Sequence, residues 1–167
     1  MIFVCLGTQI FQMNRLLREV DRLIEIGEIN EPVFAQIGRS DYVPQHFEYK
    51  DFITADEYQE KVNTADMIIT HGGTGAIVKA LKAGKQTIAV PRLFRYGEHE
   101  NDHQLQIVDF FADNGYIFKV SEMEELLPAY KKMLKHPIEK RFVGEGHVLE
   151  LIENFIDSCE NSKKNKH

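Results

Sequence analysis

The sequence predicts an α/β protein built on a doubly wound parallel sheet of the Rossmann-like kind. Short apolar segments alternate with amphipathic segments of about 10 to 15 residues, a pattern typical of successive β-α-β units with right-handed crossovers. The apolar segments are unbroken runs, as expected of strands that are covered on both faces of a sheet. Gly, His and Asn side chains gather in loops that follow three of these runs, at the strand ends where such sheets bind ligands.

The first part of the chain predicts three strands and one helix. Residues 2–6 are a continuous apolar run and are expected to form the first strand. Residues 11–26 carry apolar side chains at helical spacing with charged residues between them, so we expect an amphipathic helix that ends near Gly27. Residues 33–37 predict a second strand, and residues 48–53 a further one after a polar loop.

The middle of the chain continues the alternation of helix and strand. Thr54 and Glu57 form a capping-box pattern, which predicts a helix that begins there and runs to about Thr64. Residues 66–70 are a second strongly apolar run and predict another buried strand. A glycine-rich turn follows, and residues 76–83 are expected to form the next helix, which stops at a glycine.

The last part of the chain predicts one strand, one extended segment and three helices. Residues 87–90 form a short apolar strand that stops at a proline, and after a charged loop residues 101–112 are expected to be helical. Residues 116–120 are expected to be extended and residues 122–134 helical, and residues 148–156 form a last expected helix.

Length and composition predict a soluble, single-domain protein of a reducing compartment. The chain has 167 residues, and we expect one domain over residues 1–160 followed by a lysine-rich, frayed tail over residues 161–167. Cys5 lies within a strand as a small buried hydrophobe, and with Cys159 it forms no CxxC pattern. No apolar run reaches the roughly 18 residues that span a bilayer, and the amino end does not resemble a signal peptide.

The charge of the chain argues against nucleic acid as a partner. Its 20 basic and 26 acidic residues give a net charge of −6, so broad electrostatic attraction to a phosphate backbone is not expected.

The segment at residues 71–75, His-Gly-Gly-Thr-Gly, joins a buried strand to a helix and is a candidate phosphate site. Its glycines let a ligand approach the backbone, and the helix that begins near Thr74 presents free N–H groups and a positive dipole end. The segment is no Walker A loop, and Val78 replaces the third glycine of GxGxxG. Gly7 and Thr8 offer a second, weaker anion site, and a tight turn without a ligand is the alternative in both places.

Residues 99–103 match the zinc-protease pattern HExxH, but their context argues against a metal site. The pattern requires both histidines on one face of an established helix. Asn101 and Asp102 are typical helix-capping residues, so the helix is expected to begin between the two histidines. The acidic pair Glu98 and Glu100 is expected to form a solvated face of the same loop.

An ordered set of motifs resembles the C-terminal domain of glycosyltransferase family 28. The motifs are residues 71–75, 84–86, 91, 101–104 and 114–116. The resemblance covers about residues 1 to 120 and is strongest toward short, split members of the family. These members are the small subunit of the dolichol-linked, chitobiose-forming N-acetylglucosaminyltransferase and bacterial relatives from capsule and exopolysaccharide synthesis.

The resemblance implies the donor-binding half of a GT-B glycosyltransferase, with a UDP-sugar as donor substrate and neither a cofactor nor a metal. The residues that it implies at the donor diphosphate are Gly7, Thr8, Gly73, Thr74 and Gly75. The residues whose backbone it implies at the uracil ring are Phe52 and Ile53.

The resemblance also implies donor-sugar contacts in the loop and helix near residue 101. The implied residues are Asn101, His103 and Gln104, and amide side chains suit sugar hydroxyls because they donate and accept hydrogen bonds. The catalytic residue is not assigned, and His71 and His103 are the candidates.

Two residues depart from the family pattern. Lys79 stands where relatives usually carry an acidic residue that grips the ribose hydroxyls, and a lysine cannot accept those hydrogen bonds. Gln9 stands where many bacterial relatives have histidine after Gly-Thr.

The resemblance therefore implies the catalytic, UDP-sugar-binding subunit of a two-component inverting glycosyltransferase. The implied partner is a membrane-anchored, acceptor-binding subunit that recruits the chain from the cytoplasm to the inner face of the cell membrane. The implied acceptor is a polyprenyl-linked sugar in capsular or exopolysaccharide synthesis. Two alternatives stay open: a non-catalytic accessory subunit, and an unrelated nucleotide- or flavin-binding module.

Overall fold

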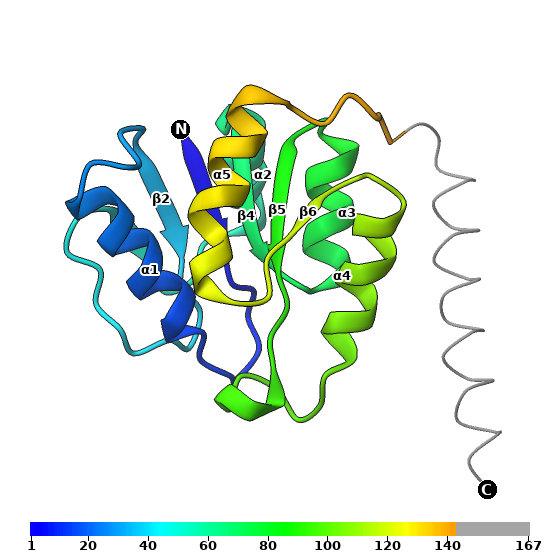
Figure 1. Cartoon of the computed structure of the whole chain (residues 1–167). Coiled ribbons are helices and arrows are strands. Elements are labelled where there is room, and N and C mark those ends of the chain that lie inside the picture. Colours follow the sequence, from blue (N-terminus) through cyan, green and yellow to red (C-terminus); the bar gives the residue numbers. More distant parts are fainter. Residues whose placement is uncertain (143–167) are drawn as a thin grey trace, which may run out of the picture.

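In the computed structural model, which describes residues 1–142, a single six-stranded parallel sheet runs through the centre of the protein (Figure 1). Its strands are β1 (Ile2–Cys5), β2 (Val33–Gln36), β3 (Glu48–Lys50), β4 (Met67–His71), β5 (Gln86–Val90) and β6 (Phe118–Lys119). The spatial order is β3-β2-β1-β4-β5-β6, and each neighbouring pair is parallel. This is the strand order of a doubly wound, Rossmann-like sheet, so the predicted fold class is confirmed.

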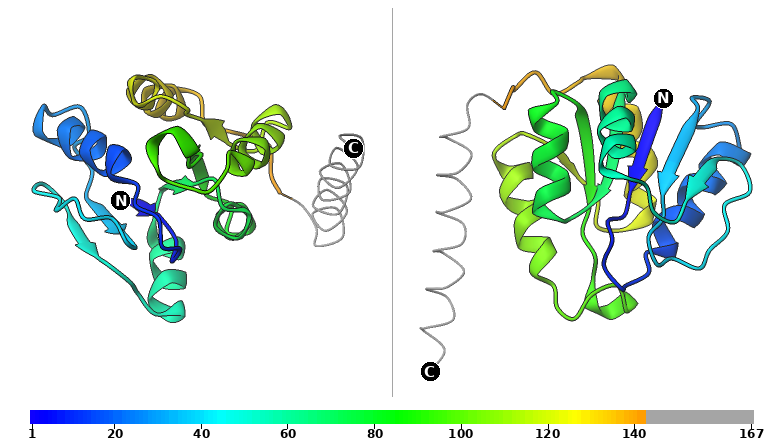
Figure 2. Two further views of the ribbon diagram at one scale, coloured as in Figure 1. Left: turned by 90° about the horizontal axis from the view of Figure 1, so that it is seen from below. Right: turned by 180° about the vertical axis from the view of Figure 1, so that it is seen from behind.

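Helices cover both faces of the sheet, as Figure 2 shows. The helices are α1 (Asn14–Glu25), α2 (Ala55–Thr64), α3 (Thr74–Lys82), α4 (His103–Asp113) and α5 (Leu126–Lys135), with 3-10 turns η1 (Phe94–Tyr96) and η2 (Met123–Glu125). Helices α1 and α5 pack on one face, and α2, α3 and α4 on the other. Among the described residues, none of these helices is long and apolar enough to cross a membrane.

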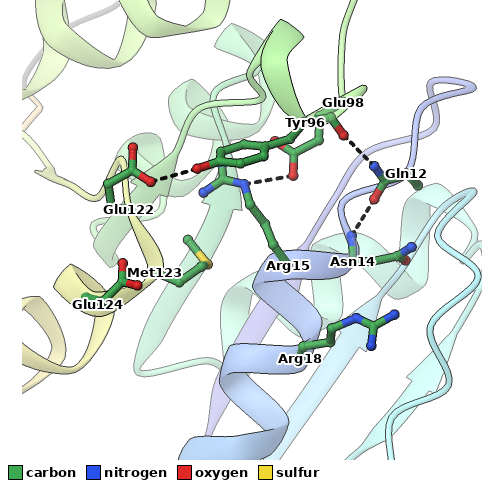
Figure 3. A pocket seen from close by; sticks show the side chains of 9 residues that line it. All are labelled: Gln12, Asn14, Arg15, Arg18, Tyr96, Glu98, Glu122, Met123 and Glu124. Atoms are coloured by element: carbon green, nitrogen blue, oxygen red, sulfur yellow. Dashed lines mark hydrogen bonds and ion pairs between the residues drawn. The ribbon is translucent and has the colours of Figure 1, made fainter.

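Helix α1 begins at Asn14, three residues later than predicted, because long-range contacts hold the preceding residues as a loop. The side chain of Gln12 accepts a hydrogen bond from the N–H of Asn14 at 2.7 Å and donates one to the carbonyl of Tyr96 at 3.0 Å (Figure 3). The guanidinium of Arg92 binds the carbonyls of both Phe11 and Gln12. Tyr96 and Arg92 lie 80 to 84 residues away from their partners Phe11 and Gln12 in the chain, so helical periodicity alone could not reveal these contacts.

Other element bounds also differ from prediction near their ends. Strand β3 stops at Lys50 and not at residue 53. The segment expected as one helix from residue 122 is divided into η2 and α5, and the carboxylate of Glu125 accepts the N–H groups of Ser121 and Glu122. The helix expected over residues 148–156, the domain end at 160 and the tail lie outside the described residues.

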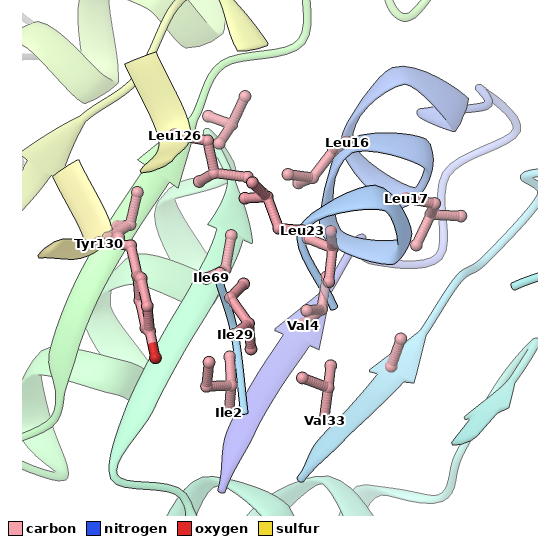
Figure 4. Close-up of a cluster of buried hydrophobic side chains, with 14 of the residues drawn as sticks. Ile2, Val4, Leu16, Leu17, Leu23, Ile29, Val33, Ile69, Leu126 and Tyr130 are labelled. Atoms are coloured by element: carbon pink, nitrogen blue, oxygen red, sulfur yellow. The ribbon is translucent and has the colours of Figure 1, made fainter. Parts of the chain in front are cut away.

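The core forms because side chains of each central strand alternate between the two faces of the sheet. Ile2 and Val4 of β1 pack with α1 and α5, whereas Phe3 and Cys5 pack with α2 and α3. Figure 4 shows the first of these clusters, in which leucines of α1 meet β1 and Leu126 of α5. Fully burying a large apolar side chain contributes roughly 1.5 to 3 kcal/mol, so β1 is anchored to helices on both faces of the sheet.

The loop between β2 and β3 is tied to α1 by the carboxylate of Asp21, which is 3% exposed. This carboxylate accepts hydrogen bonds from the hydroxyl of Tyr42 at 2.6 Å and from the N–H groups of Gln45 and His46 at 2.9 and 2.8 Å. Burial acts to raise the pKa of Asp21, but these hydrogen bonds, led by that of Tyr42, hold it below its ordinary value.

We expect the Asp21→Asn variant to be less stable than the wild type by about 1 to 3 kcal/mol at pH 7, because an amide faces these donors with one acceptor oxygen fewer. The folded pKa of Asp21 is depressed, so its contribution is complete above the unfolded pKa of about 4 and is lost as the pH falls through the folded pKa. Urea unfolding from pH 7 to pH 3 measures this. The difference in unfolding free energy between the wild type and Asp21→Asn should become smaller in acid. A difference that stays constant would contradict a lowered pKa of Asp21 in the folded protein.

Candidate functional site

A cleft of about 380 Å³ opens at the carboxyl end of β1 and β4. At this point the chain turns from β2 and β3 on one side of β1 to β4 on the other, and such a switch in strand order leaves a crevice for a ligand. The cleft is lined by residues from the ends of β2 and β4, from the loops after β1, β3 and β4, and from α2, α3 and α4. They are Gly7, Thr8, Gln9, Gln36, Ile53, Thr54, Ala55, Tyr58, His71, Gly73, Gly75, Ala76, Lys79 and Gln104.

The glycine turn after β4 leads directly into α3, which begins at Thr74, two residues before the expected bound at residue 76 and where the free N–H groups were expected. Gly73 is the N-cap residue, and no side chain of the described residues caps this end of the helix. The N–H groups of Thr74 and Gly75 therefore have no partner within α3 and remain available to a ligand. Together with the positive end of the helix dipole, they make this wall of the cleft suitable for a phosphate group.

His71 lies between the two glycine segments of the cleft and is buried by them. A Cβ atom added to Gly7 would lie 2.8 Å from Cε1 of His71, and one added to Gly73 would overlap Nε2. Nδ1 of the ring lies 3.2 Å from the carbonyl oxygen of Cys5, and because a carbonyl only accepts, Nδ1 carries the proton. The imidazole therefore fills a space that exists only because both neighbours lack side chains.

The imidazole of His71 is neutral at pH 7. Burial, followed by the positive charge of Arg92, lowers the pKa of His71 to about 4. A group with this pKa is a weak base, so the geometry favours a role in shaping the turn over a role as general base.

Arg92 joins the loop after β1 to the loop after β5, and it is only 1% exposed. Its guanidinium donates to the carbonyls of Leu6 at 2.6 Å and of Phe11 and Gln12 at 2.9 Å each. These bonds bracket the segment that contains Gly7. Burial lowers the pKa of Arg92 to about 10, so the group still carries its charge at pH 7.

Glu98 supplies the buried negative charge beside Arg92, and it is also 1% exposed. Its carboxylate accepts from Nε of Arg15 at 2.8 Å (Figure 3). It also accepts from the N–H of Leu93 at 3.1 Å. The prediction that Glu98 belongs to a solvated face is therefore wrong, whereas Glu100 is exposed as expected. Hydropathy could not identify Glu98, because its partner Arg15 lies 83 residues away.

Of the three residues predicted to contact the donor sugar, the structure places only Gln104 in the cleft. Its side chain is 5% exposed, and Oε1 accepts a hydrogen bond from the N–H of Arg92 at 3.1 Å. Asn101 and His103 are exposed and do not line the cleft. The side-chain oxygen of Asn101 accepts from the backbone N–H of His103 at 2.9 Å and holds the start of α4.

Most of the residues predicted to contact the diphosphate and the uracil ring lie in the cleft, unlike most of those predicted for the donor sugar. Gly7, Thr8, Gly73, Gly75 and Ile53 all line the cleft, and Thr74 lies between two of them in the chain. Phe52 is the exception: it is 40% exposed, and the guanidinium of Arg39 lies 5.1 Å from the centre of its ring.

Tyr58 and Gln36 also line the cleft, and neither was predicted as a site residue. Tyr58 lies in the first turn of α2. The capping-box pattern located the start of this helix, and this was the signal that could have placed Tyr58 near the strand ends. Gln36 is a polar residue at the end of an otherwise apolar strand, which is the signal that could have found it.

The HExxH pattern at residues 99–103 does not place two histidines on one helix face. Helix α4 begins at His103 with Asp102 as its N-cap, as the capping residues predicted. His99 precedes the helix, and its ring lies 5.2 Å from that of Phe11.

The strand order, the switch-point cleft and the uncapped start of α3 define a Rossmann-like domain with a cleft suited to a nucleotide or another phosphorylated ligand. A family model described as "Glycosyltransferase family 28 C-terminal domain" matches residues 1–142. The chain belongs to this family.

Individual relatives support this assignment. Over 125 residues the chain is 29% identical to the human "UDP-N-acetylglucosamine transferase subunit ALG13", covering 70% of this chain and 11% of that protein. Over 156 residues it is 23% identical to a transferase of Prochlorococcus marinus (strain MIT 9301), covering 92% of this chain and 40% of that protein. The chain thus spans less than half the length of these relatives.

The fold also resembles a solved structure. The solution structure of ALG13 superimposes with a TM-score of 0.60 at 17% sequence identity, covering 90% of this chain and 93% of that one. This similarity concerns the fold alone, because the identity is low.

Proposed function

We propose that the chain is the donor-binding, catalytic subunit of a two-component inverting glycosyltransferase that uses a UDP-sugar. The observation that carries the proposal is the uncapped start of α3 at the switch-point cleft, where the N–H groups of Thr74 and Gly75 can bind a diphosphate. Family membership supports the choice of a UDP-sugar, because the matched relatives are named as UDP-N-acetylglucosamine transferases.

The reaction in this proposal is a direct displacement at the anomeric carbon of the donor sugar. An acceptor hydroxyl attacks from the face opposite UDP, a new glycosidic bond forms, and the bond between the sugar and the diphosphate breaks. Negative charge grows on the leaving diphosphate, where the start of α3 stabilises it. Because His71 is a weak base, we assign removal of the acceptor proton to a group of the partner. The scheme routes no step through a metal or a cofactor.

A partner subunit follows from the same proposal. ALG13 is named as a subunit of its transferase, and this chain covers nearly all of its solved structure. We propose an acceptor-binding partner that is anchored in the membrane and holds the chain at its cytoplasmic face. The Prochlorococcus relative is named as acting on a pyrophosphoryl-undecaprenol-linked substrate, which supports a polyprenyl-linked sugar as acceptor. Capsular or exopolysaccharide synthesis is the corresponding pathway class.

A non-catalytic accessory subunit is the second candidate function. Gln9 favours it, because this lining residue of the cleft cannot act as an acid or base.

Titration calorimetry with UDP is expected to show one site per chain, and the complex with the cognate partner is expected to transfer sugar from a UDP-sugar. The expectation rests on the free N–H groups of Thr74 and Gly75 in the cleft. UDP binding without transfer by an assembled complex would favour the accessory role. Absence of UDP binding would contradict the proposal that the cleft is a donor site.

A further inference from the structure

We propose that Lys79 is a phosphate-binding residue of the cleft, which contacts a phosphate oxygen of the donor. The inference rests on the proposed function and deepens it, because it assigns a charged ligand group to a residue that departs from the family pattern. Lys79 lines the same cleft as Gly73, Gly75 and Ala76.

The position of Lys79 on α3 directs its side chain toward the start of that helix. Long side chains in helices point back toward the N-terminus, so a residue in the second turn reaches over the first turn. Nζ of Lys79 lies 4.9 Å from the centre of the Tyr58 ring, across the cleft on α2. The ammonium group therefore lies between α3 and α2, in the same cleft that Gly73 and Gly75 line at the start of α3.

Tyr58 provides a fixed, neutral support for this ammonium group. Burial, followed by the nearby thiol of Cys5, raises the pKa of Tyr58, so its phenol stays protonated at neutral pH. Its hydroxyl lies 3.5 Å from Sγ of Cys5 and its ring meets Phe3 edge-on, so the ring is fixed in the core. A cation over the face of a fixed ring is attracted to it without being neutralised.

The charge of Lys79 is not balanced by any group of the described structure. No carboxylate among residues 1–142 pairs with it, although the chain as a whole has a net charge of −6. Because His71 is neutral, Lys79 is the one charged residue at pH 7 among the described residues that line the cleft. An ammonium without a carboxylate partner, in the same cleft as a helix N-terminus, favours an anion, and a diphosphate offers two phosphate groups to these two sites.

The chemistry of an ammonium group distinguishes phosphate from ribose. Lys79 donates hydrogen bonds and accepts none, so it cannot hold ribose hydroxyls as a carboxylate does. A phosphate oxygen only accepts and carries charge, which makes it the matching partner.

The test compares the Lys79→Met variant with the wild type by calorimetry, using uridine, UMP, UDP and inorganic pyrophosphate as separate ligands. Lys82→Met is the matched control, because it removes the same charge from an exposed position of the same helix outside the cleft. We expect Lys79→Met to weaken binding of UMP, UDP and pyrophosphate by about tenfold or more and to leave binding of uridine unchanged, since the variant loses a charge-assisted hydrogen bond to phosphate. Lys82→Met should bind all four like the wild type.

Each other outcome has a distinct meaning. An equal loss for uridine and UDP would place Lys79 at the ribose and overturn the inference, as would unchanged binding of UDP and pyrophosphate. If the wild type binds pyrophosphate but no uridine compound, the proposed function fails while the pyrophosphate titration still tests Lys79. A wild type that binds none of the four overturns both.

Discussion

Replacing Gly73 with alanine is expected to weaken UDP binding at least about tenfold and to lower the free energy of unfolding by about 1 to 3 kcal/mol. The new Cβ atom would overlap Nε2 of His71 and lie within 3.1 Å of two ring carbons. The imidazole cannot simply withdraw, because Gly7 presses on its other side and Nδ1 is bonded to the carbonyl of Cys5. Either the ring or the turn must move, and the turn carries the start of α3.

The matched control is Gly75→Ala, two residues further along the same segment. A Cβ atom at Gly75 meets nothing within 4 Å, and the position is already helical, so the fold should keep its stability. Urea unfolding of both variants gives the comparison of stability, and UDP calorimetry compares Gly73→Ala with the wild type, because Gly75 itself lines the cleft. The double variant His71→Ala with Gly73→Ala should recover part of the stability lost by Gly73→Ala, because it removes the atoms that clash. Equal stability of the two glycine variants would show that His71 does not confine the turn.

The fold was predictable because its main signals are local. The apolar runs of β1 and β4 marked the central strands, and the Thr54–Glu57 capping box marked the start of α2, which the structure confirms with both hydrogen bonds. The start of α3 was located to within two residues from the glycine turn before it. Each of these features depends on neighbours within a few residues, which a sequence pattern records directly.

The candidate site was predictable only in part, because its remaining features depend on distant contacts. The glycine turn could be recognised as a site, but the position of Asn101 outside the cleft depends on how the loop after β5 is folded. That loop is shaped by the buried groups of Arg92 and Glu98, whose partners lie across the sheet. Composition indicates only that such residues are charged, and charged residues are usually exposed.

Replacing Glu98 with alanine is expected to cause a large loss of stability, about 3 to 5 kcal/mol. The change leaves the guanidinium of Arg92 buried without a nearby negative charge, and it removes the acceptor for Arg15 and Leu93. Glu98→Gln keeps the shape and one acceptor oxygen, so it should cost less than alanine. Glu100→Ala is the control: this neighbouring glutamate is exposed, and its loss should change stability by no more than about 0.5 kcal/mol.

Urea unfolding should therefore show the largest loss of stability for Glu98→Ala, a smaller loss for Glu98→Gln and almost none for Glu100→Ala. UDP calorimetry on the folded proteins should show losses of affinity in the same order. Arg92 bonds the loop after β5 to the segment that contains Gly7, and Glu98 bonds the same loop to Arg15 of α1, so loosening these two buried charges displaces one wall of the cleft. If Glu98→Ala were as stable as Glu100→Ala, the buried charge pair would not be what fixes these loops. If stability fell while UDP affinity stayed unchanged, the pair would support the fold without positioning the site.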